Sequence, residues 1–269
     1  DQQVGSRVSA LYAINTLGAA AGAWAAGFAL MPNFGVRHTI QISALINLII
    51  FALVIFRHFR YNLGQLHLQK PAVADRQRKS QPTPTFRSNI FSSHAIWILP
   101  GICISGFASF GYEILWTRLL SHVLGGSIYA FSTMLGTFLV GIALGGALAG
   151  KLAKDREQST FFFMLVQLGI ALTSILMYLL IDQLIPDNRN WASQLLFCVM
   201  VMLPSTIFIG MTFPLAVRIL SPDEVGVAEN TAKVYMWNTV GAIGGAIVTG
   251  YYIIPQYGFN GTIHFNVMI

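Results

Sequence analysis

One carboxyl group stands out in this sequence because of where it lies. Of ten Asp and Glu residues, only Glu113 lies well inside an apolar stretch. A carboxylate in hydrocarbon is costly unless it is protonated or paired, so such a residue is a candidate functional group. It can take up a proton, bind a cationic solute, or act as a structural carboxyl that hydrogen-bonds a neighbouring helix. The sequence leaves these interpretations open.

Aromatic and amide side chains accompany this carboxyl group as further candidates. Tyr112 precedes Glu113, and Trp116 follows three residues later, which places it on the same side of a helix. Trp116 can instead anchor the helix at a membrane interface. Asn15 and Asn238 each lie three residues before a glycine. Such amides can hydrogen-bond across helices or contact a solute.

Glycines at a spacing of four form the next pattern. The pairs are Gly18 and Gly22, Gly141 and Gly145, and Gly241 and Gly245. Small residues at this spacing let two membrane helices approach closely, either as static packing or as a sliding contact. A dinucleotide-binding loop is excluded because no predicted strand precedes these glycines.

The composition indicates that lipid surrounds most of the chain. The 269 residues are 55% hydrophobic and 10% charged, whereas soluble domains contain about a quarter charged residues. The six histidines and two cysteines show no metal-ligand spacing, so we expect no metal site and no cofactor. The net charge of +6 resides mainly in loops between apolar runs, which argues against a nucleic-acid partner.

Apolar runs of about 20 residues predict membrane-spanning helices. Transmembrane β-strands are excluded because they would be about ten residues long with alternating polarity. The sequence therefore predicts an all-α membrane protein with seven complete spans and one partial span. The predicted spans are 8–31, 38–57, 95–118, 126–150, 161–185, 192–218 and 232–255, with the partial span beginning near 260.

A long basic segment separates the second and third spans. Residues 60–94 are rich in Lys, Arg and Pro, and they are predicted to form a flexible linker. If this linker lies in the cytoplasm, most of the 16 Lys and Arg residues fall on the cytoplasmic side, and Arg37, Arg118 and Arg189 fall outside. The excess of Lys and Arg on the linker side predicts this orientation. We expect the membrane to be a bacterial cytoplasmic membrane.

An internal repeat relates two distant helices. Residues 12–35 (YAINTLGAAAGAWAAGFALMPNFG) and 235–258 (YMWNTVGAIGGAIVTGYYIIPQYG) are identical at 10 of 24 positions. The copies fall in the first and seventh predicted spans, six spans apart, so both have the same orientation. Two parallel six-helix halves joined by a cytoplasmic loop are the layout of the major facilitator fold. We therefore expect 1–59 to end the first half, 60–94 to link the halves, and 95–269 to form the second half, as part of a 12-helix bundle whose first four helices precede residue 1.

A second stretch resembles the same superfamily. Residues 146–156, GALAGKLAKDR, are similar to its Gly-x-Leu-Ala-Asp-Arg loop. In that loop an Asp and an Arg couple helix movement by charge pairing, so the resemblance implies a gating role for Asp155 and Arg156. An ordinary basic cytoplasmic turn is the alternative.

The sequence also resembles the membrane part of spermidine-synthase-like fused transporters. The similarity rests on residues 105–155, which include the Tyr-Glu-x-x-Trp-Thr-Arg run, and on both Tyr-x-x-Asn-Thr-x-Gly repeats. Those proteins join a major-facilitator-like bundle to an aminopropyltransferase-like domain. The glycine-rich cofactor loop and acidic polyamine site of that domain are absent from this sequence, so no enzymatic activity is expected for the chain.

Two functions are compatible with these features. The first, and the leading hypothesis, is a transporter moiety for a small solute, with a polyamine-like cation suggested by the resemblance and by Glu113. The second is a non-transporting membrane anchor or accessory subunit, within a larger membrane complex or beside a fused aminopropyltransferase-like domain. The scarcity of polar residues in the spans favours the second, since a solute path usually needs several.

Overall fold

The computed structural model describes residues 2–68, 95–152, 155–186, 190–221 and 226–269. These residues form helices and no strands, which confirms the all-α prediction. The helices belong to two compact units. One comprises Asp1–Phe28 and Ile90–Ile269, and the other comprises Ala29–Asn89. Most of the predicted linker, residues 69–94, lies outside the described residues, but helix α2 extends through 60–68.

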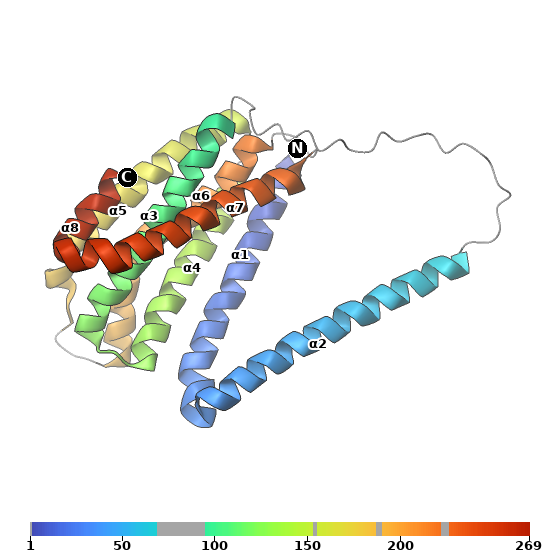
Figure 1. Ribbon diagram of the computed structural model, residues 1–269, viewed down its shortest axis with the longest axis horizontal. Helices are drawn as coiled ribbons and strands as arrows, with labels where there is room; N and C mark the ends of the chain where they lie inside the picture. The colour runs from blue at the N-terminus through green and yellow to red at the C-terminus, as the bar shows by residue number, and fades with distance from the viewer. Residues whose placement is uncertain (1, 69–94, 153–154, 187–189, 222–225) are drawn as a thin grey trace. The chain divides into compact units, whose positions relative to one another are not determined.

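Eight α-helices, labelled in Figure 1, and two short π-helical segments make up the described chain. They are α1 (Gln2–Trp24), η1 (Ala25–Leu30), α2 (Met31–Leu68), α3 (Ala95–Leu124), α4 (Ile128–Leu152), α5 (Arg156–Leu184), α6 (Trp191–Leu220), α7 (Val227–Val248), η2 (Thr249–Ile253) and α8 (Ile254–Met268).

Five helical runs among the described residues are long and apolar enough to cross a membrane. Four of them are α3 to α6, close to the predicted bounds. The fifth, Val8–Arg60, contains 53 residues. A straight helix of this length would measure about 80 Å, more than twice the roughly 30 Å of a bilayer core, so this run accommodates the first two predicted spans. The predicted span 232–255 is helical in α7 and η2, but it is not among the five.

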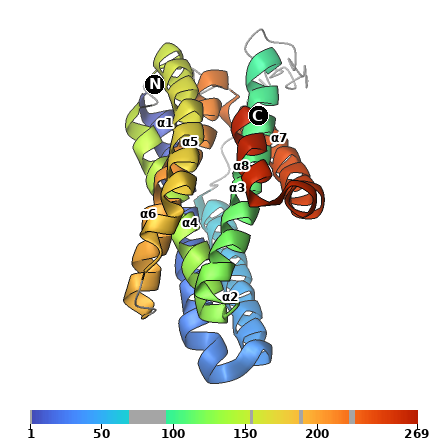
Figure 2. The same cartoon turned by 90° about the vertical axis from the view of Figure 1, so that its left-hand side faces the viewer.

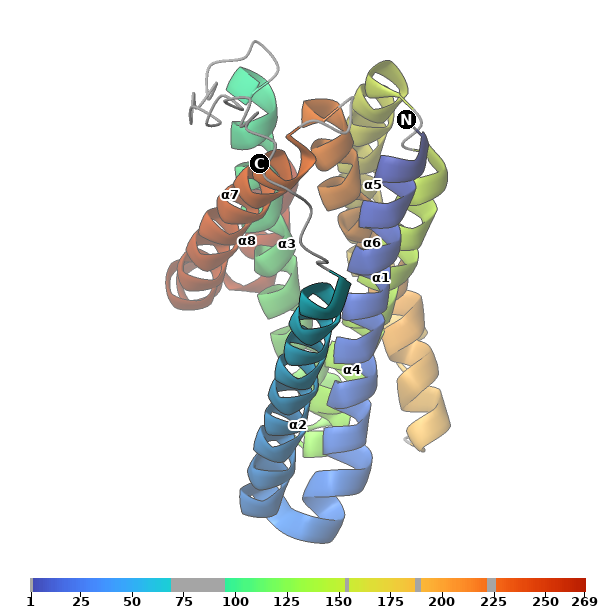
Figure 3. The same ribbon diagram turned by 90° about the vertical axis from the view of Figure 1, so that its right-hand side faces the viewer.

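The larger unit contains two sets of closely packed helices. Helix α4 packs between α1 and α6, and α6 also packs against α5. Helix α3 packs against α7 and α8, as Figures 2 and 3 show. Contacts of α6 with α3 and α7 join the sets. The largest fully buried side chains at the centre include Trp116, Tyr112 and Phe197.

The internal repeat has a structural counterpart. Both copies widen into a π-helix at the same place, η1 in the first and η2 in the second. Each π-helix precedes a repeated proline, Pro32 or Pro255, which lacks the N–H that would bond back into that turn. Three residues later Gly35 (φ 71°, ψ 171°) and Gly258 (φ 64°, ψ −167°) adopt a backbone conformation that is essentially confined to glycine. The shared bends support the repeat independently of sequence identity.

The glycine pairs of the two copies lie in different surroundings. A Cβ built at Gly241 would overlap the carbonyl oxygen of Cys103, and Gly245 meets the α3 backbone in the same way. The equivalent Gly18 and Gly22 have no atom within 4 Å of such a Cβ among the described residues. One copy of the motif therefore packs backbone against backbone, and the other is exposed.

The opposite faces of the repeat helices show the reverse pattern. Ala13 and Ala20 are buried where α1 packs in the unit. Their repeat equivalents on α7, Met236 and Ile243, are 54% and 56% exposed. The two repeat helices thus use complementary faces for packing, although their sequences are related.

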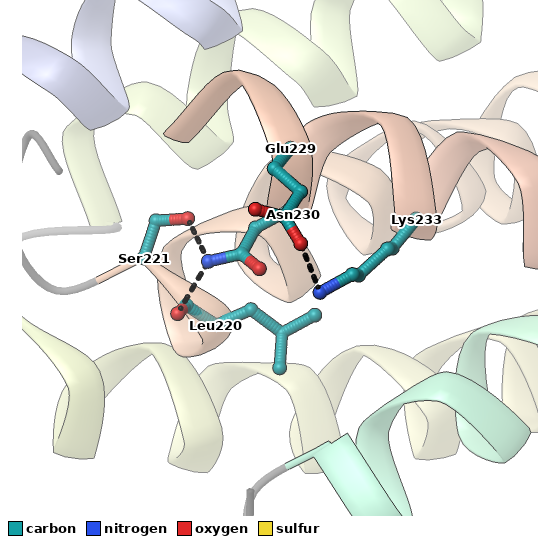
Figure 4. Close-up of polar contacts among 5 residues, drawn as sticks. All are labelled: Leu220, Ser221, Glu229, Asn230 and Lys233. Carbon is teal, nitrogen blue, oxygen red and sulfur yellow. Dashed lines mark hydrogen bonds and ion pairs between the residues drawn. The ribbon is translucent and has the colours of Figure 1, made fainter. Parts of the chain in front are cut away.

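Polar contacts join the end of α6 to the start of α7. The Asn230 side-chain amide donates to the Leu220 carbonyl at 3.0 Å and to the Ser221 hydroxyl at 3.1 Å (Figure 4). On the same turn of α7, Glu229 and Lys233, on either side of Asn230 in the sequence, form an ion pair at 2.7 Å. The amide occupies a carbonyl that the helix end would otherwise leave unpaired, which fixes the position of α7 relative to α6.

Candidate functional site

Glu113 lies near the middle of α3 and is partly buried. Within the described chain, no ion pair or hydrogen bond is formed by its carboxyl group. Because the carboxyl group lies within an apolar helix and has no such contact, it can receive a proton or a cationic group. This position carries the candidate site.

Tyr112 and Trp116 have a different environment from Glu113. Both are almost fully buried, at 1% and 0% exposure. Successive residues of a helix are rotated by about 100°, so the Tyr112 side chain points about a quarter turn away from that of Glu113. Trp116 lies on the Glu113 side, where its burial makes it part of the packing around the carboxyl group. Its position in the core differs from that of an interface anchor.

The two repeat asparagines also differ. Asn238 of α7 lies against α3, and a Cβ built at Gly106 would lie 2.9 Å from its side-chain oxygen. Gly106 is seven residues from Glu113, which puts both on one face of α3, about 10 Å apart along the axis. Asn15, its repeat equivalent on α1, is exposed. The structure thus brings Asn238, and not Asn15, to the helix that carries Glu113.

The second glycine pair mediates another close contact. A Cβ at Gly145 would overlap the Ile207 carbonyl oxygen, and one at Gly141 would overlap the Thr206 hydroxyl. From the other side, Gly210 meets the α4 backbone equally closely. Helices α4 and α6 are therefore held at backbone distance by glycines on both partners. This geometry is the close packing that the GxxxG spacing predicts.

An aromatic cluster that was not predicted as a site joins the two repeats. Tyr12 stacks on Phe213 of α6, with ring centroids 5.0 Å apart, and Tyr235 meets the same ring edge-on at 6.3 Å. Tyr12 and Tyr235 are repeat equivalents, so matched positions from both copies converge on one side chain. The repeat alignment contained the tyrosines, but no pattern in the sequence indicated Phe213 as their shared partner.

Asp155 and Arg156 make capping contacts. The Asp155 carboxylate accepts from the Gln158 backbone N–H at 2.8 Å and is the N-cap of α5. The Arg156 Nε donates to the Ile219 carbonyl at 2.9 Å, near the end of α6. Arg156 therefore connects the start of α5 to the end of α6, and Asp155 caps α5 itself.

This arrangement predicts a difference between two substitutions of Asp155. Asp155→Ala removes the cap and should lower the free energy of unfolding by about 1 kcal/mol. Asp155→Asn keeps a capping oxygen and should leave stability nearly unchanged. Thermal unfolding in detergent measures both effects. If solute transport falls in Asp155→Asn while its free energy of unfolding is unchanged, the charge of Asp155 has a role in transport. Equal losses of stability in Asp155→Ala and Asp155→Asn would contradict the capping role.

Comparison with known proteins is consistent with this architecture. A Polyamine aminopropyltransferase of Leptospira interrogans is 27% identical over 151 residues, which cover 55% of this chain and 28% of that protein. The chain thus aligns with less than a third of its length. No solved structure is significantly similar. The sequence pattern of the Major Facilitator Superfamily matches residues 1–249, nearly the whole chain. This match, together with the apolar helices, shows that the chain belongs to the Major Facilitator Superfamily.

Proposed function

We propose that this chain is the transporter moiety of a membrane protein that moves a small solute, and that the solute is a polyamine-like cation. Membership of the Major Facilitator Superfamily supports a transport role. The observation that carries the choice of a cation is the partly buried Glu113 in the middle of α3. A carboxylate in a low-dielectric site attracts an ammonium group strongly.

The other candidates have supporting roles in this proposal. Asn238 lies on the same side of α3 as Glu113 and can offer an uncharged contact to the solute. Trp116 and Tyr112 are buried on the same side of Glu113 around the helix axis, and Trp116 is close enough in the helix to shape the space around the carboxyl group. Asp155 caps α5 and Arg156 links α5 to α6, and we propose that both act in gating on the cytoplasmic side.

Uptake by reconstituted protein tests the proposal. The intact protein is placed in liposomes, and entry of labelled spermidine and putrescine is followed against protein-free liposomes. We expect saturable uptake that excess unlabelled polyamine suppresses. Uptake of an uncharged solute, with no effect of polyamines, would contradict the cation; no uptake of any solute would contradict transport.

The alternative is a membrane anchor or accessory subunit. It is favoured by the exposed Asn15, Gly18 and Gly22 side of α1, where small residues leave backbone accessible to a further helix. The related aminopropyltransferase is consistent with a fused soluble domain. In that case purification under mild conditions should recover the chain in a larger membrane complex, and polyamine uptake should be absent.

The proposed membrane arrangement follows from the basic residues. With the linker 60–94 in the cytoplasm of a bacterial cell, 1–59 would end one half of the bundle and 95–269 would form the other. Cysteine substitution in the linker tests this orientation, because a cytoplasmic cysteine in intact cells should resist a membrane-impermeant thiol reagent. Labelling without cell lysis would reverse the orientation.

A further inference from the structure

The two sets of helices in the larger unit are packed more rigidly inside than between. The first set comprises α1, α4, α5 and α6, and the second comprises α3, α7 and α8. In the first, α4 and α6 meet at backbone distance through Gly145 and Gly210. In the second, α3 and α7 do so through Gly241 and Gly245. No described glycine brings a backbone of one set against a backbone of the other. Because backbone atoms cannot yield as side chains can, each set is suited to move as one body.

Near its start, α7 contacts α6 of the other set through an aromatic pair. The rings of Tyr235 and Phe213 are nearly perpendicular, at 86°, with centroids 6.3 Å apart. Phe213 is 7% exposed, whereas Tyr235 is 64% exposed. Phe213 is therefore fixed within the first set, and Tyr235 touches it from outside. A ring that keeps most of its surface free can separate from its partner without leaving a buried cavity behind.

The repeat equivalent of Tyr235 contacts the same ring in a different way. Tyr12 of α1 stacks on Phe213 at 5.0 Å, with the planes 15° apart. On α4, a Cβ built at Gly146 would lie 2.8 Å from the Tyr12 ring. Tyr12 is thus packed between α4 and α6, inside the first set. Of the two matched tyrosines, Tyr235 is the one that joins the sets.

The start of α7 is held to the end of α6 by a polar contact. The Asn230 amide donates to the Leu220 carbonyl and to the Ser221 hydroxyl (Figure 4). Helix α7 begins directly after Gly226, which has φ 77° and supplies no side-chain cap. A glycine in this conformation at a helix boundary can absorb a change in backbone direction. Asn230 therefore anchors the start of α7 beside a possible pivot, and the Tyr235 contact lies further along the helix.

We propose that Tyr235 and Phe213 form a latch between the two sets of helices, with Gly226 as its pivot. When the rings are in contact, as in this structure, α7 is held against α6. When they separate, the second set turns away while Asn230 keeps the start of α7 at the end of α6. Because α3 belongs to the second set, this movement shifts Glu113 relative to α4 and α6. The latch goes beyond the proposed transport function, and it can be measured without uptake.

Distances between spin labels on the two sets test the latch. The labels are placed at Phe161→Cys on α5 and Val240→Cys on α7, both exposed positions. The intact protein, with Cys103 and Cys198 replaced by alanine, is studied in lipid nanodiscs by double electron–electron resonance. We expect one main distance when Tyr235 is present. Tyr235→Ala should raise the population of a longer distance by roughly three- to tenfold, the change that loss of one aromatic pair predicts.

Three tyrosine variants serve as controls. Tyr235→Phe keeps the ring and should leave the distance distribution unchanged. Tyr251→Ala removes another exposed tyrosine of the second set, one with no ring contact among the described residues, and should also leave it unchanged. Tyr12→Ala acts inside the first set, so it should lower the midpoint of thermal unfolding without lengthening the distance. Equal lengthening in Tyr12→Ala or Tyr251→Ala would overturn the assignment to Tyr235.

A variant of the other ring completes the test. Phe213→Leu removes the ring but still fills the buried position, and it should reproduce the longer distance. It keeps the test valid if Tyr235→Ala misfolds. A distribution that is unchanged in both Tyr235→Ala and Phe213→Leu would overturn the latch. Because the readout is a distance, this result is independent of whether the protein takes up polyamines.

Discussion

Gly241→Val will destabilise the protein, and Gly18→Val, its repeat equivalent, will not. The valine side chain at Gly241 would overlap the Cys103 carbonyl oxygen on α3. A backbone atom cannot move aside as a flexible side chain can, so α3 and α7 must separate. Overpacking of this kind costs about 1–3 kcal/mol, and more where the backbone must shift. Unfolding in increasing SDS, followed by the loss of helix or by a proximity probe between α3 and α7, measures the difference.

The control is strict because the two glycines belong to one repeated motif. Gly18 and Gly241 occupy the same position in helices of related sequence, so the change in helix propensity is the same for both. The difference between the variants therefore reports packing alone. Gly22 and Gly245 form a second matched pair. Gly245→Val should destabilise the protein, and Gly22→Val should not. Equal losses at Gly18 and Gly241 would contradict the observed surroundings and would mean that another helix covers α1.

The helices themselves could be predicted from the sequence because lipid imposes a simple rule. A span needs about 20 apolar residues, and the expected 126–150 and 192–218 correspond closely to α4, Ile128–Leu152, and α6, Trp191–Leu220. The repeat also gave the positions of Pro32 and Pro255 before the bends were known. The π-helices at those bends could not be predicted, since they depend on how the chain accommodates a missing N–H.

The surroundings of the candidate residues could not be predicted. Asn15 and Asn238 have matching sequence contexts, yet one is exposed and the other lies against Gly106. Whether an asparagine is covered depends on which helix packs beside it. The sequence motif is the same in both copies, so it cannot indicate that difference. Likewise, Gly111 and Asn266 are far apart in the chain, and only the packing of α3 against α8 brings the Asn266 amide against Gly111.

The sides of α3 that carry Glu113 and Tyr112 differ in polarity. The Glu113 side carries a carboxyl group that can attract a cation, while the Tyr112 side carries a buried, uncharged hydroxyl. Neighbouring residues of a helix point in directions about 100° apart. One helix can therefore present an acidic side and an uncharged side.

Glu113→Gln should reduce polyamine uptake by at least about tenfold. The amide keeps the size of the side chain and loses the charge that attracts an ammonium group. A hydrogen bond to a charged partner is worth about 1.5–3 kcal/mol, and 1.4 kcal/mol corresponds to a factor of ten. Glu157→Gln, at an exposed carboxylate in the first turn of α5, is the control and should retain uptake. Initial rates in liposomes over a range of spermidine concentrations measure both variants.

The form of the loss distinguishes the two chemical roles of Glu113. If the carboxylate binds the solute, the substitution should raise KM, and Glu113→Asp should restore part of the affinity because it restores the charge. If the carboxyl group takes up a proton during transport, the substitution should lower kcat and remove the dependence of uptake on the pH gradient. Unfolding in detergent should be similar for Glu113→Gln and the unsubstituted protein, since the Glu113 carboxyl forms no ion pair or hydrogen bond within the described residues. Full uptake by a folded Glu113→Gln protein would exclude this carboxyl group from both roles, and the solute path would then have to be sought away from this face of α3.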